Sequence, residues 1–115
     1  MISIRRPQAL TIDLGEAGSF EASGHALPAR DGAALVEVLE ALSEARTGRQ
    51  LADAVDRIAA VLSCYVLDVR DVVEIETWPE SEEERAALLA QWPAEFLVSF
   101  ALQWTRGDAP KKPSE

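Results

Sequence analysis

The sequence is poor in the residues that usually build a catalytic or metal centre. It has one cysteine, Cys64, and one histidine, His25, among its 115 residues. A single cysteine excludes an internal disulfide and any zinc site made of several cysteines. Sparse cysteine is also typical of proteins in a reducing compartment, so we expect a cytoplasmic location.

Long apolar runs and basic residues are scarce as well. No stretch reaches the ~18 apolar residues that a membrane-spanning helix needs, so we expect no membrane association. Lys and Arg number 11 against 20 Asp and Glu, for a net charge of −9. Arg85 is the only basic residue between positions 71 and 105. Because nucleic-acid surfaces gather Lys and Arg on one face, direct binding of DNA or RNA is disfavoured.

The residues that are present indicate one folded domain. Hydrophobic residues make up 48% of the chain and charged residues 27%, which is typical of a globular protein. We expect a single compact domain over residues 1–107. Residues 108–115 contain two prolines, two lysines and no large apolar side chain, so we expect a flexible tail there.

Alternating apolar and polar residues predict strands in the first quarter of the chain. Residues 10–14 alternate in this way, and residues 19–23 can form a returning strand. Gly15 and Gly18 lie between them and favour a tight turn. We therefore expect a β-hairpin over residues 9–23. The short alternation at residues 2–4 predicts another strand.

Four later segments have the spacing of amphipathic helices, namely residues 33–46, 47–65, 81–92 and 93–106. Their starts carry capping signals: Asp31 for the first, Thr47 with Gln50 for the second, Ser81 with Glu84 for the third and Pro93 for the fourth. Gly48 is expected to close the first helix. Residues 58–62 are apolar on every side, which predicts that the second helix is the most buried.

Residues 68–78 fit two structures. Val73, Ile75 and Thr77 alternate with glutamates, as in a strand that is exposed on one face, but a loop is equally compatible. A third strand here would support the hairpin, which is rarely stable alone. The sequence as a whole predicts an α+β fold, with an N-terminal β-hairpin packed on a small bundle of about four helices.

The residues capable of chemistry do not form a recognisable site. His25 lies in a predicted loop without a partner at ligand spacing, and Cys64 lies on an apolar helix, where a packed and inert thiol is expected. The acidic residues of segment 74–84 lack the loop pattern of a calcium site. We therefore expect no enzyme activity, no metal and no cofactor.

Aromatic residues are concentrated in the last third of the chain. Phe96, Phe100 and Trp104 are spaced by four and form a stripe on the last helix, which either packs on the core or contacts a partner. We expect Phe100 in the core and Trp104 at an interface, with one edge in water. The partner-binding candidates are Trp78, Glu80, Glu82, Glu83, Trp92, Phe96 and Trp104.

Three segments in the second half of the chain follow one another in a characteristic order. They are Val-Leu-Asp-Val-Arg-Asp-Val-Val at 66–73, Trp-Pro-Glu-Ser at 78–81, and Leu-Leu-Ala-Gln-Trp-Pro at 88–93 before a short apolar helix. This order resembles the C-terminal half of phage tail assembly chaperones, over about residues 58–106. Asp71 stands where such proteins often carry glycine. The resemblance implies a non-enzymatic protein that binds the tape-measure or tail-tube protein and keeps apolar helices soluble before the tail forms.

The acidic charge also fits a second class of protein. An acidic inhibitor of the anti-CRISPR or anti-restriction type blocks a basic nucleic-acid-binding surface. Such an inhibitor needs a continuous array of carboxylates, whereas the acids here are concentrated in residues 71–84. The sequence leaves both classes open, together with a homo-oligomer.

Overall fold

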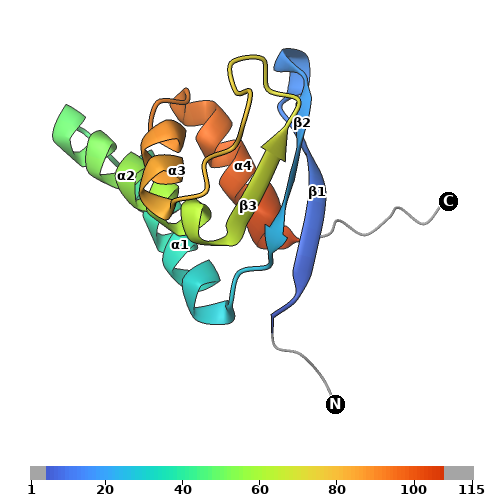
Figure 1. Ribbon diagram of the computed structural model, residues 1–115. Coiled ribbons are helices and arrows are strands. Elements are labelled where there is room, and N and C mark those ends of the chain that lie inside the picture. The colour runs from blue at the N-terminus through green and yellow to red at the C-terminus, as the bar shows by residue number, and fades with distance from the viewer. Residues whose placement is uncertain (1–4, 108–115) are drawn as a thin grey trace, which may run out of the picture.

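An antiparallel three-stranded sheet lies against four helices in the computed structural model, in which residues 5–107 are described (Figure 1). The strands β1 (Pro7–Asp13), β2 (Ser19–His25) and β3 (Val66–Arg70) are adjacent in that order. The helices are α1 (Ala29–Ser43), α2 (Gly48–Tyr65), α3 (Glu82–Leu89) and α4 (Ala94–Arg106). The predicted α+β class is confirmed. The strand expected at 2–4 and the tail expected at 108–115 lie outside the described residues.

The predicted hairpin is present and extends beyond residues 9–23. Ile12 pairs with Phe20, and the side chains of both point into the core. A 3₁₀ turn (Gly15–Ala17) connects the strands. Gly15 and Gly18 have φ angles of 71° and 111°, a region that glycine enters without steric cost. The glycines therefore make this turn, as their positions predicted.

The third strand lies earlier in the chain than the alternation of residues 73–77 suggested. It continues directly from α2, and the chain passes so close to Gly24 that a Cβ there would lie 1.9 Å from the Tyr65 carbonyl oxygen. The strand ends where Asp71 adopts a left-handed φ of 71°. That turn directs the chain away from the sheet, so residues 71–81 are irregular and Val73 is 94% exposed. The alternation does not correspond to a strand.

Two of the predicted helix caps are confirmed. The Thr47 hydroxyl accepts the Gln50 amide at 3.1 Å, and the Ser81 hydroxyl accepts the Glu84 amide at 3.1 Å. The predicted cap at Asp31 is wrong, because α1 already begins at Ala29.

Asp31 instead accepts a hydrogen bond from the Tyr65 hydroxyl, which joins the first turn of α1 to the last turn of α2. The prediction that Gly48 closes the first helix is also wrong. That helix ends at Ser43, and Gly48 is the first residue of α2. Pro93 precedes α4 directly, as expected.

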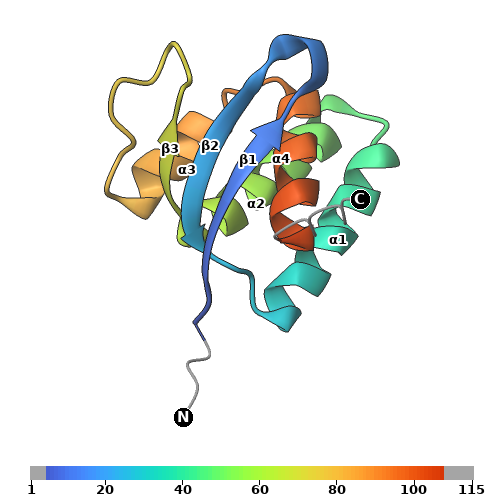
Figure 2. The same ribbon diagram turned by 90° about the vertical axis from the view of Figure 1, so that its right-hand side faces the viewer.

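The helices share one core on a single face of the sheet (Figure 2). The second half of α2 lies at its centre, in contact with α1, α3, α4 and β3. The start of α2 is exposed, so the expectation that this helix is the most buried holds only for its second half. The buried face of α4 contributes Leu97, Phe100, Ala101 and Trp104. No helix among residues 5–107 is long and apolar enough to cross a membrane.

Arg85 is a buried charged side chain that holds the irregular segment in place. Its guanidinium donates to the carbonyl oxygens of Pro79, Ser63 and Glu80 at 3.0, 2.7 and 2.6 Å. The Ser63 carbonyl belongs to the last turn of α2, where the helix dipole favours a cation. Arg85 therefore links α3, the end of α2 and the segment that leads from β3.

Candidate functional site

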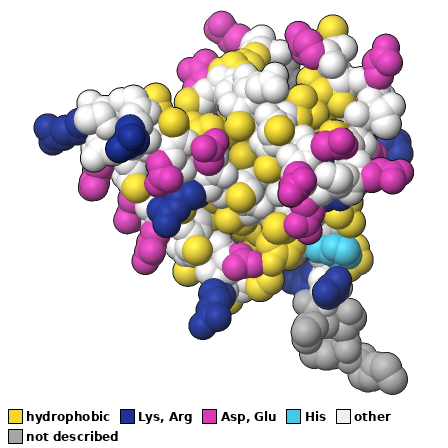
Figure 3. Space-filling view, turned by 60° about the vertical axis from the view of Figure 1, so that its left-hand side comes forward, with side chains coloured by type: hydrophobic (Ala, Val, Ile, Leu, Met, Phe, Trp, Pro, Cys, Tyr) yellow, Lys and Arg dark blue, Asp and Glu magenta, His cyan; other side chains and the backbone are white. Residues whose placement is uncertain are grey.

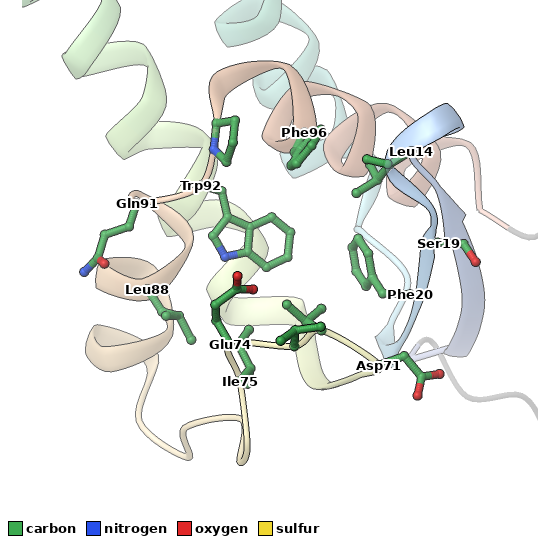
Figure 4. A pocket seen from close by; sticks show the side chains of 14 residues that line it. Leu14, Ser19, Phe20, Asp71, Glu74, Ile75, Leu88, Gln91, Trp92 and Phe96 are labelled. Atoms are coloured by element: carbon green, nitrogen blue, oxygen red, sulfur yellow. The ribbon is translucent and has the colours of Figure 1, made fainter.

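A groove of about 520 Å³ opens between the hairpin turn, the segment after β3 and the turn between α3 and α4 (Figure 4). We call it the aromatic groove. Its apolar lining includes Leu14, Phe20, Val72, Leu88, Trp92 and Phe96. The three segments come from distant parts of the sequence, so the groove exists only in the folded chain. Val73, the most exposed large apolar side chain within residues 5–107, also lines it.

Stacked and edge-on aromatic rings form the rigid wall of the aromatic groove. The ring centroids of Trp92 and Phe20 are 5.4 Å apart and edge-on, and those of Phe20 and Phe100 are 5.0 Å apart. Trp92 also stacks on Phe100 at 5.8 Å. Such pairs add about 0.5–1.5 kcal/mol each beyond the burial of their surfaces. Trp92 is thus anchored on the buried Phe100 while remaining half-exposed to the groove.

Trp92 lies in the turn between two helices, not at the end of a helix. The predicted third helix ran to residue 92, but α3 ends at Leu89. Pro93 cannot continue a helix from the preceding turn, because its ring clashes with that turn and it lacks an amide hydrogen. The chain therefore turns at residues 90–93, and Trp92 points into the middle of the groove (Figure 4). Phe96 follows in the first turn of α4 and completes the wall.

The lining of the aromatic groove is weakly acidic. Asp71 and Glu74 are the charged residues of its lining, and no basic residue is among them. The side chains of Ser19 and Asp71 point away from the groove, so few polar groups converge inside it (Figure 4). The groove has few groups that could orient a small polar substrate, whereas its apolar lining is complementary to an apolar side chain.

Two of the tryptophans predicted to bind a partner are structural. Trp78 is 5% exposed, and its indole nitrogen donates to the Val66 carbonyl at 3.2 Å. Trp104 is 1% exposed, and its indole nitrogen donates to the His25 carbonyl at 3.1 Å. The expectation that Trp104 keeps an edge in water is wrong, because a strand carbonyl satisfies its N–H group inside the protein. Phe100 is fully buried, as predicted.

The acidic candidates Glu80, Glu82 and Glu83 are exposed and lie outside the aromatic groove. Glu82 and Glu83 occupy the first turn of α3, where negative charge is favoured by the helix dipole. Acidic side chains are spread over the helical side of the molecule, between apolar and uncharged atoms (Figure 3). The structure thus brings together Trp92 and Phe96 of the predicted residues, and it separates them from the glutamates.

The residues capable of chemistry occupy different positions from those expected. Cys64 is exposed, so the prediction of a packed thiol is wrong. Partial burial and then the Glu82 carboxylate raise the pKa of this thiol, which makes it a poor nucleophile at neutral pH. His25 is the last residue of β2 and is half-buried, not an exposed loop residue. Between residues 5 and 107, no group of three or more His, Cys, Asp and Glu side chains could hold a metal ion.

Sequence reasoning identified Trp92 and Phe96 but missed the other half of the groove. Leu14 and Phe20 come from the hairpin and Val72 from the segment after β3, and no local pattern joins them to the aromatic C-terminal part. The sequence predicted only that Phe20 lies on a returning strand over residues 19–23. Only the packing of the hairpin against α4 places it beside Trp92.

The fold and its groove define an α+β protein with a preformed, apolar and weakly acidic surface cleft. Comparisons with protein-family models, with curated proteins and with solved structures find no match.

Proposed function

We propose that this chain is a non-enzymatic chaperone that binds an apolar helical segment of a partner protein in the aromatic groove. The observation that carries the proposal is the row of half-buried aromatic side chains, Trp92 and Phe96, beside the exposed Val73. Aromatic side chains held in a rigid wall are favoured anchors at protein interfaces. An amphipathic helix that lies in such a groove contacts it through residues spaced by three and four.

The groove suits a protein segment better than a small polar substrate. It is a shallow cleft bounded by three segments, and its few polar side chains do not converge on one point. Contiguous exposed apolar surface of this kind commonly marks a site of protein interaction. The acidic residue Glu74 of the lining favours a segment whose apolar face is flanked by Lys or Arg.

The partner that we propose is the tape-measure protein of a phage tail, bound in the cytoplasm before the tail tube forms. This choice rests on the resemblance of residues 58–106 to phage tail assembly chaperones, and the tail-tube protein is the second partner of that kind. One backbone feature supports it. Asp71, which stands where those proteins often carry glycine, has the left-handed φ of 71° that glycine adopts most easily.

The test is direct binding of helical segments from phage tape-measure proteins. Titrations would follow tryptophan fluorescence, because Trp92 is half-exposed in the groove while Trp78 and Trp104 are buried. Val73→Glu should weaken binding at least about tenfold, since it places a charge in the apolar contact. Val36→Glu is the matched control, because Val36 is also exposed but lies on α1 outside the groove.

Two results would contradict the proposal. One is that no tape-measure or tail-tube segment binds. The other is that Val73→Glu and Val36→Glu affect binding equally. Binding to a basic nucleic-acid-binding protein that survives Val73→Glu, and is lost when Glu80, Glu82 and Glu83 are changed to glutamine, would favour the acidic inhibitor instead.

A further inference from the structure

β1 is an edge strand with unpaired backbone groups at its centre. The Arg6 carbonyl accepts the Ala26 amide, and the Leu14 amide donates to the Gly18 carbonyl. The even-numbered residues of this strand therefore direct their backbone N–H and C=O groups toward β2. In an antiparallel ladder the intervening residues then direct their N–H and C=O groups outward. These outward residues include Ala9, Thr11 and Asp13.

The outward groups of Asp13 already have a partner. The Asp13 amide donates to the Gln103 side-chain oxygen at 3.0 Å, and the Gln103 side-chain nitrogen donates to the Asp13 carbonyl at 2.8 Å. Gln103 thus supplies the two hydrogen bonds that a neighbouring strand would make. Within residues 5–107, the N–H and C=O groups of Ala9 and Thr11 on the same edge have no such partner. An edge of this kind is a template for another strand.

A second groove runs along this edge, between β1 and α4. It has a volume of about 320 Å³, and we call it the β1–α4 groove. Leu10 lines it from the strand and Leu102 from the helix. Leu10 is half-buried and Leu102 is 40% exposed, so both have apolar surface left to cover. A strand added to β1 would cover that surface with its inward-facing side chains.

We propose that the occupant is a second copy of this chain, whose β1 pairs antiparallel with the first across a two-fold axis at Leu10. In this register, Ala9 of one copy exchanges both backbone hydrogen bonds with Thr11 of the other. The two Leu10 side chains meet at the axis, next to Leu102 of each copy. Pairing stops at the ends, because Pro7 has no amide hydrogen and the backbone of Asp13 is held by Gln103.

The pattern of free backbone groups supports a second copy as the occupant. Within residues 5–107, the outward N–H groups of β1 without a partner are those of Ala9 and Thr11, and they lie at equal distances on either side of Leu10. This segment is therefore self-complementary, because a two-fold axis at Leu10 gives each of these N–H groups a carbonyl acceptor in the other copy. The Asp13 carboxylate takes no part in the contact, since its side chain lies on the face of the sheet opposite α4 and accepts the Gly15 amide at 2.9 Å.

The first test is the oligomeric state in solution. Sedimentation over about 5 to 500 µM covers the affinities that small interfaces have, and the full chain should pass from monomer to dimer in that range. Thr11→Pro removes an outward N–H without touching a bond to β2, and should weaken the dimer at least about tenfold. Thr11→Val keeps the N–H and should leave the dimer intact. A wild-type chain that stays monomeric throughout overturns the proposal.

The second test identifies the symmetric arrangement and does not depend on proline. Leu10→Lys and Leu10→Glu each place like charges opposite each other at the axis, so each variant alone should be monomeric. A mixture of the two variants should dimerise again, because a lysine of one copy then lies opposite a glutamate of the other. Circular dichroism should show both variants folded. If folded variants dimerise as the wild type does, or if their mixture stays monomeric, this interface is wrong.

Discussion

Replacement of Arg85 by alanine should lower the free energy of unfolding by about 3–5 kcal/mol, because it removes a charged donor from three backbone carbonyls. Each hydrogen bond to a charged group contributes about 1.5–3 kcal/mol, and an orphaned buried acceptor costs about 1–3 kcal/mol. The Ser63 carbonyl is the most enclosed of the three acceptors. Water can reach the partly buried carbonyls of Pro79 and Glu80. The expected loss of unfolding free energy is therefore smaller than the sum for three fully buried hydrogen bonds.

Urea unfolding followed by tryptophan fluorescence measures this loss, since the buried Trp78 lies on the segment that Arg85 holds. Arg85→Lys keeps the charge but not the forked donor, so it should lose about half as much. Arg57→Ala is the matched control, because Arg57 is exposed on α2 and should change stability by less than about 0.5 kcal/mol. A loss below about 1 kcal/mol for Arg85→Ala would refute the role assigned to the guanidinium.

Three further changes test the core, the turn and the hydrogen bond between α1 and α2. Phe100→Ala should lower stability by about 3–5 kcal/mol in the same urea assay, because Phe100 contacts the rings of Phe20, Trp92 and Trp104. Asp71→Gly should raise the melting temperature by the equivalent of about 0.5 kcal/mol, because glycine adopts the positive φ without strain; a lower melting temperature would contradict this. Tyr65 is the only tyrosine, and its hydrogen bond to Asp31 raises its pKa to about 12, so its ultraviolet titration should have a midpoint well above 10. The stability that this bond contributes should be present below pH 10 and lost between pH 10 and 12. Asp31→Asn should lower the midpoint of the Tyr65 titration. An unchanged midpoint would exclude the hydrogen bond as the cause of the raised pKa.

The parts of the fold that the sequence predicted depend on local interactions. The hairpin follows from its alternation and from the two glycines of its turn, and the caps at Thr47 and Ser81 join residues three positions apart. Such signals are contained in a few consecutive residues. The class of the fold and the positions of most elements were therefore predictable without knowledge of the packing.

The errors concern residues whose environment is set by distant segments. Trp104 has the sequence context of a helix end beside solvent, but the carbonyl of His25, 79 positions away, satisfies its indole N–H inside the core. The alternation at residues 73–77 has strand character, but the left-handed turn at Asp71 removes this segment from the sheet. In each case tertiary contacts or a single backbone torsion outweigh the local pattern.

The two proposed interfaces lie at opposite ends of α4. Phe96 in its first turn lines the aromatic groove, and Arg106 at its last residue lines the β1–α4 groove. A helix of 13 residues is about 20 Å long, so a second copy at one end leaves the other end open. A dimer would then carry two aromatic grooves, and a partner with two suitable helices could engage both at a higher effective concentration than one groove offers. Dimerisation at the strand edge would thus strengthen binding at the grooves without changing a contact inside either of them.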